Sequence, residues 1–100
     1  MGEVRLSRRA RSDLLDIWRH IAIDNGLATA DYWIDRIEAR CRHLAAFPKS
    51  GPPRPDIAPE ARMLVIARWL VLHQVEAADV RIARIVDAAR NLGELDLSGE

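Results

Sequence analysis

The sequence predicts an α+β protein in which one antiparallel sheet is covered on one face by a hairpin of two helices. Three observations support this fold class. Apolar residues recur at helical spacing across 8–46, three strand-like segments follow residue 60, and all five prolines lie between these two halves. One hundred residues and an apolar fraction of 49% suit one folded domain with one core. We therefore expect the order β-α-α-β-β-β in a single domain over 1–90, followed by a tail or short helix over 91–100.

The first half of the chain carries the signals of a strand and a helical hairpin. Residues 3–6 alternate polar and apolar side chains, which indicates a short half-buried strand. Ser7 suits the N-cap of a first helix, which we place at about 8–24 from its apolar stripe. Asn25-Gly26 ends this helix, because Gly readily takes the left-handed C-terminal conformation. A second stripe predicts a helix over about 28–46, and the short joint makes the pair antiparallel.

The second half reads as a stiff connector and a strand meander. The prolines between 48 and 59 predict an extended loop, because proline fixes φ and lacks an N–H. Three strand candidates follow at 61–66, 69–75 and 79–86, and the short breaks between them suit antiparallel turns, although neither contains Gly. With helices on one face of this sheet, the other face needs another cover or stays exposed for binding.

The charged residues are unevenly distributed along the chain, although the formal net charge is zero. There are 15 basic and 15 acidic residues, but 1–12 carry four Arg against one Glu, and 61–90 carry five Arg against three acids. Fourteen of the bases are Arg, which grips carboxylates and phosphates with a planar fork and stacks on flat groups. This bias suits a recognition surface, and a GC-rich genome or thermal adaptation explains it equally well.

Several classes of chemistry lack the residues they need. The single Cys41 excludes an intramolecular disulfide and a Cys-based metal cluster, and the three His are far apart without metal-ligand spacing. There is no Gly-rich phosphate loop and no serine nucleophile motif. The N-terminus runs straight into Arg-rich polar sequence, and no apolar run approaches the ~20 residues of a membrane span. We therefore expect a cytoplasmic protein that uses no metal, no small-molecule cofactor and no membrane.

The remaining signal lies in the strand half, where side chains suited to binding a target or partner gather. The candidates are Arg62, Arg68, Trp69, His73, Arg81, Arg84 and Arg90. Some of these arginines are expected to line one surface and bind acidic or phosphate groups, unless they are solvated or pair with nearby acids. Trp69 suits either the core or a stacking platform, and for His73 a hydrogen-bonded packing role is favoured over catalysis.

These segments resemble, in order and with compatible spacing, the ParE-type toxins of the RelE/ParE superfamily over about residues 4–90. The stretches that carry the resemblance are Leu6–Ala10, Asp13–Trp18, Leu44–Gly51, Arg54-Pro55, Arg62, Ala67–Val71, Val80–Val86 and Ala89-Arg90. The resemblance implies a bacterial toxin that a cognate antitoxin binds and neutralises, its C-terminal part wrapping around the toxin. ParE members inhibit DNA gyrase and RelE members cut mRNA on the ribosome, so the shared fold does not fix the activity.

The chain departs from the family pattern at four positions. Family members often have Gly where Ala67 and Ala88 stand, Tyr where His73 stands, and His where Asp87 stands. A RelE-like nuclease needs basic, His or Tyr groups for proton transfer and for the cleaving phosphate, and a carboxylate at 87 repels a phosphate.

These departures favour a non-enzymatic toxin whose target is DNA gyrase. One alternative is a ribosome-dependent mRNA endonuclease that uses Arg62, Arg68, Arg84 and His73. Another is a module that has lost toxicity and only assembles with its antitoxin.

Overall fold

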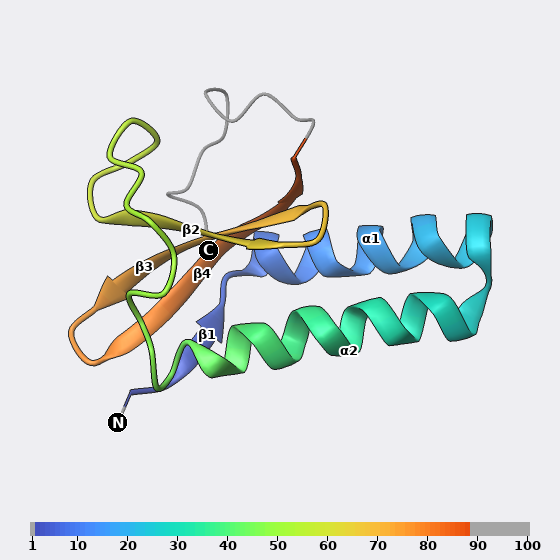
Figure 1. The fold of residues 1–100 in the computed structure, drawn as a ribbon, viewed down its shortest axis with the longest axis horizontal. Helices are drawn as coiled ribbons and strands as arrows, with labels where there is room; N and C mark the ends of the chain where they lie inside the picture. The colour runs from blue at the N-terminus through green and yellow to red at the C-terminus, as the bar shows by residue number, and fades with distance from the viewer. Residues whose placement is uncertain (1, 89–100) are drawn as a thin grey trace.

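Two helices and a four-stranded sheet form two layers in the computed structural model, which describes residues 2–88 (Figure 1). The elements in chain order are β1 (Val4–Leu6), α1 (Arg8–Asn25), α2 (Leu27–His43), β2 (Ala61–Ile66), β3 (Trp69–Glu76) and β4 (Asp79–Asp87). The predicted order β-α-α-β-β-β is confirmed. The predicted tail or short helix over 91–100 lies outside the described residues.

The sheet has the strand order β1-β4-β3-β2. As predicted, β2, β3 and β4 form an antiparallel meander, with Ile66 opposite Trp69 and Glu76 opposite Asp79 at its two turns. β1 pairs with β4 in parallel, with Val4 opposite Val80, so the predicted antiparallel sheet is mostly, not wholly, antiparallel. No turn links β1 to its neighbour, and its direction is therefore set by the whole path through the hairpin and the meander.

The ends of the helices follow from local chemistry. The Ser7 hydroxyl accepts the Ala10 amide at 3.0 Å, as an N-cap does. Gly26 has φ 93°, a value L side chains rarely adopt, and this one residue reverses the chain from α1 into α2. α2 ends at His43 rather than at the predicted 46, because residues 44–46 form a turn.

Both meander turns place an alanine where glycine is usual. Ala67 has φ 53° and Ala77 has φ 56°, in the left-handed region. A left-handed conformation costs a non-glycine residue roughly 1–2 kcal/mol, so the surrounding strand pairing holds these turns against local strain.

The two faces of the sheet have different covers. On the helix side, Ile37, Leu44, Val71, Ile82 and Ile85 are among the buried residues of the main core. On the opposite side, Ile57 and Ala58 of the proline-rich segment pack against a small cluster of Ala61, Leu72 and Ala83. The proline-rich segment therefore covers part of the sheet face opposite the helices, which we expected to be either covered or exposed. Val65 on β2 stays 52% exposed.

Candidate functional site

Arg84 is held inside the molecule by Asp13 of α1. Its Nε and Nη2 atoms donate to the two carboxylate oxygens of Asp13 at 2.8 and 3.0 Å, and Arg84 is only 6% exposed. The hydrogen-bonded carboxylate raises the pKa of Arg84 above its ordinary value. Arg84 is therefore held in an internal ion pair, and its predicted role in binding a partner stays a prediction.

Asp13 also binds a backbone group at the edge of β4, in the part of that strand with which β1 does not pair. β1 pairs with β4 only as far as Ile82. Beyond that point the Ser7 hydroxyl donates to the Ala83 carbonyl at 2.8 Å, and the Ile85 amide donates to Asp13 at 2.9 Å. The start of α1 thus takes the place of an edge strand, which removes backbone groups that other chains would otherwise pair with.

Arg68 lies at the surface, but its charge is already paired. Its Nε atom donates to Asp87 Oδ2 at 2.9 Å, Nη2 contacts the same oxygen, and the guanidinium lies 5.9 Å from the Trp69 ring centroid. The side chain is 70% exposed, so this pair contributes little to stability. Asp87, the carboxylate at a position where family members often carry His, therefore neutralises the charge of Arg68.

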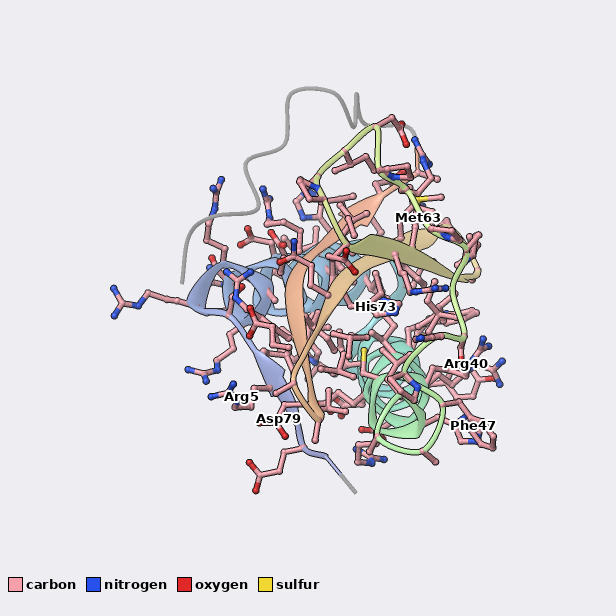
Figure 2. The ribbon with its side chains drawn as sticks, turned by 90° about the vertical axis from the view of Figure 1, so that its left-hand side faces the viewer. Arg5, Arg40, Phe47, Met63, His73 and Asp79 are labelled. Carbon is pink, nitrogen blue, oxygen red and sulfur yellow. The ribbon has the colours of Figure 1, made fainter. Side chains whose placement is uncertain are left out.

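His73 and Trp69 are both buried. His73 is 0% exposed, its Nδ1 lies 3.4 Å from the Val71 carbonyl, and its Nε2 has no hydrogen-bond partner. Burial lowers the pKa of His73 and Arg62 adds to the effect, so the ring is neutral at pH 7. Figure 2 shows His73 inside the molecule, close to the strands. Trp69 is 6% exposed and packs on Trp33 with ring centroids 5.4 Å apart, which settles its two predicted roles in favour of the core.

The other predicted arginines have separate roles. Arg62 Nη1 donates to the carbonyls of Lys49 and Gly51 at 3.2 and 2.7 Å, which ties the chain after α2 to β2. Arg81 is half-buried and donates to Gln74 at 3.3 Å. Arg90 lies outside the described residues. The predicted set therefore does not form one cationic surface within residues 2–88.

A groove of about 820 Å³ follows the outer side of β1, and we call it the β1 groove. Its apolar lining comes from β1 and both helices: Val4, Leu6, Leu14, Leu15, Trp18 and Ile34. Charged side chains complete the lining: Arg5, Arg11, Glu38, Glu76 and Arg81. Because β1 is an edge strand, one row of its backbone groups has no partner strand. The β1 groove therefore offers apolar area, charge and a free strand edge together.

A second groove of about 440 Å³ lies between α1 and the ends of β3 and β4. Ile17, Ile21 and Trp69 are among its apolar lining residues, while Asp16 and Asp24 give it an acidic rim.

Across residues 2–88, no three or more His, Cys, Asp or Glu side chains are grouped so that they can hold a metal ion. Nor does any helix in this part of the chain have the length and apolar character to cross a membrane.

Sequence reasoning missed Asp13, although a signal was present. Asp13 falls between Ala10 and Ile17 at helical spacing, on the apolar side of α1. A carboxylate on a buried stripe requires a cationic or amide partner, because an unpaired buried charge is very costly. The identity of that partner, 71 residues away, depends on the tertiary fold.

Comparison with known proteins identifies relatives over almost the whole chain. Residues 4–92 match the family model described as ParE toxin of type II toxin-antitoxin system, parDE. Toxin ParE3 of Caulobacter vibrioides is 36% identical over 92 residues, which is 92% of each chain. A solved structure described as the chromosomal ParDE TA system from P. aeruginosa superposes with a TM-score of 0.78 at 24% identity, covering 87% of this chain and 96% of the other.

Proposed function

This chain belongs to the ParE toxin family of type II toxin–antitoxin systems, and we propose that it inhibits DNA gyrase by binding rather than by catalysing a reaction. One observation gives the main support for a non-enzymatic mode of action. The side chains that a RelE-like nuclease would use on a phosphate are engaged within the molecule. Arg84 is bound by Asp13, Arg68 by Asp87, and His73 is closed off from solvent.

Cleavage of a phosphodiester needs positioned groups that can reach the substrate. A general acid or base must approach within hydrogen-bond distance of the proton it transfers, and developing phosphate charge needs free donors. Arg62 donates hydrogen bonds to two backbone carbonyls. Arg68 would have to leave Asp87 to bind a phosphate, and the Asp87 carboxylate would repel that phosphate. These contacts disfavour the ribonuclease alternative and leave surface recognition as the mode of action.

A supercoiling assay tests the proposal directly. Purified toxin is added to gyrase, ATP and relaxed plasmid, and we expect loss of supercoiled product that preincubation with the antitoxin reverses. A parallel reaction with mRNA on stalled ribosomes should leave the mRNA intact. Normal supercoiling at tens of micromolar toxin would refute gyrase inhibition, cleaved mRNA would support the nuclease, and harmless overexpression without antitoxin would support a non-toxic module.

We also propose that the cognate antitoxin neutralises this chain by docking in the β1 groove. An extended segment can add to the free edge of β1 while its apolar side chains contact Leu15 and Trp18. Arg11 favours an acidic residue on that segment, because opposite charges across an interface speed association and fix register, whereas Arg5 already lies 3.8 Å from Asp79 and 4.0 Å from Glu76. Leu15 is 48% exposed, so its side chain is available to an apolar residue of the antitoxin.

Two matched substitutions separate this site from the other edge of the sheet. Leu15→Glu places a carboxylate in the β1 groove, and Val65→Glu does the same on β2, where the side chain is 52% exposed. We expect Leu15→Glu to weaken antitoxin binding at least tenfold in calorimetry and Val65→Glu to leave it within twofold. The reverse pattern would place the antitoxin on β2, and both variants should keep the melting temperature of the free toxin.

A further inference from the structure

The outward face of α2 carries a row of aromatic and cationic side chains. Its members are spaced at intervals of four, four, three and four residues, which places them on one side of the helix and of the turn that follows it. They are Tyr32, Arg36, Arg40, His43 and Phe47. All five are exposed, Tyr32 by 54% and Phe47 by 55%. We call this row the α2 stripe, and none of its residues lines the β1 groove or the second groove.

The stripe contains two ring units with a cation between them. The Arg36 guanidinium lies 5.7 Å from the Tyr32 ring centroid and donates to the Tyr32 hydroxyl at 3.4 Å. The rings of His43 and Phe47 lie 4.8 Å apart with a tilt of 35°. Arg40 lies between these units in the sequence, and Figure 2 shows Arg40 and Phe47 projecting outward on the same side of α2. Two arginines therefore lie between the rings at the two ends of the stripe.

Several arginines elsewhere in the molecule are held in ion pairs with aspartates. Arg54, Arg68 and Arg84 each bind an aspartate. Within residues 2–88, by contrast, neither Arg40 nor Lys49, which follows Phe47 by two residues, makes an ion pair through its side chain. The acids of α2, which are Asp31, Asp35 and Glu38, lie on a different side of the helix. The stripe is therefore a locally positive surface on a chain whose net charge is zero.

We propose that the α2 stripe binds single-stranded nucleic acid, with Arg36, Arg40 and Lys49 at phosphates and Tyr32 and Phe47 stacked on bases. Unpaired cations favour a polyanion, and counterion release from phosphates provides the affinity. Exposed rings beside those cations provide sequence-tolerant stacking, which is how proteins hold unpaired strands. An acidic protein segment fits less well, because protein partners anchor apolar side chains in pockets and the stripe is a convex helix face outside both grooves.

Fluorescence anisotropy with the full chain tests the proposal without gyrase or antitoxin, so it holds or fails separately from the proposed function. The probe is a labelled oligothymidylate of about 20 nucleotides at low salt. Three phosphate contacts predict a slope of about −2 in log affinity against log salt, since each single-strand contact contributes about −0.7. R36A/R40A should reduce the slope to less than half and weaken binding at least tenfold. R8A/R19A removes two exposed α1 arginines instead and should leave binding within twofold.

Ring variants and competitors complete the test. Phe47→Ala should weaken binding about fivefold or more, whereas Phe47→Tyr keeps the flat face and should bind as well as the parent chain. Unchanged melting temperatures show that the variants fold. Equal losses in R36A/R40A and R8A/R19A would overturn the proposal, as would no binding at low salt. Competition by poly-glutamate as strong as by unlabelled oligothymidylate would also overturn it, in favour of an acidic protein partner.

Discussion

The pair of Asp13 and Arg84 is predicted to be among the most costly polar contacts to break. Asp13→Ala leaves a guanidinium whose side chain is 7% exposed without its counter-charge, and it leaves the Ile85 amide without an acceptor. Removing one partner of a buried ion pair costs about 3–5 kcal/mol, of which an unpaired amide accounts for about 1–3 kcal/mol. For a domain of this size the melting temperature should fall by on the order of 12–40 °C.

Urea unfolding followed by circular dichroism provides the measurement. Asp13→Asn removes the charge and keeps an oxygen that can accept from Ile85, so it should cost clearly less than Asp13→Ala. Combining Asp13→Leu with Arg84→Met removes both charges, and the remaining loss should be about 1–3 kcal/mol for the stranded amide. A cost below about 1 kcal/mol for Asp13→Ala would refute the reasoning, because the pair would then behave as a surface salt bridge.

Three further predictions concern a buried base, a turn and a thiol. Burial lowers the pKa of His73, so the unfolded chain binds a proton that the folded chain excludes. The free energy of unfolding should therefore fall as the pH drops below about 6.5, by at most about 1.4 kcal/mol per pH unit. In urea titrations between pH 7 and 5, His73→Phe should remove this part of the pH dependence. Ala67→Gly relieves a left-handed alanine and should raise the urea midpoint by the equivalent of up to about 1 kcal/mol, whereas a lower midpoint would show that the turn is not strained. Burial, with Glu38 adding to it, raises the pKa of Cys41 to about 12, so iodoacetamide at pH 8 should label the chain only in urea, as intact mass will show.

Much of the fold follows from local signals in the sequence. Ser7 and Gly26 mark the ends of α1 by their capping chemistry, and alternation or apolar runs place the last three strands to within one residue. The prolines predict a stiff connector, and the structure adds that Ile57 and Ala58 within it cover the second face of the sheet. What the local signals do not contain is the partner of β1, because three residues carry no information on direction or neighbour.

The candidate site was less predictable for the same reason. Arg68, Arg81 and Arg84 look alike in sequence, yet one pairs at the surface, one is half-buried beside Gln74 and one is buried with Asp13. A strand pattern cannot distinguish these outcomes, because each depends on an element far away in the chain. The β1 groove was likewise not predicted, since it exists only where the hairpin and the first strand meet.

The pairing of β1 with β4 also bears on how the toxin is made on the ribosome. Ser7 and Ala83, which bond across this junction, are separated by 76 residues. During translation the hairpin emerges with its apolar side uncovered, because Val71, Ile82 and Ile85 are synthesised later. In a nascent or prematurely terminated product that lacks β4, β1 has no strand to pair with and the β1 groove cannot form. If the antitoxin docks there, it recognises the finished chain and not the growing one.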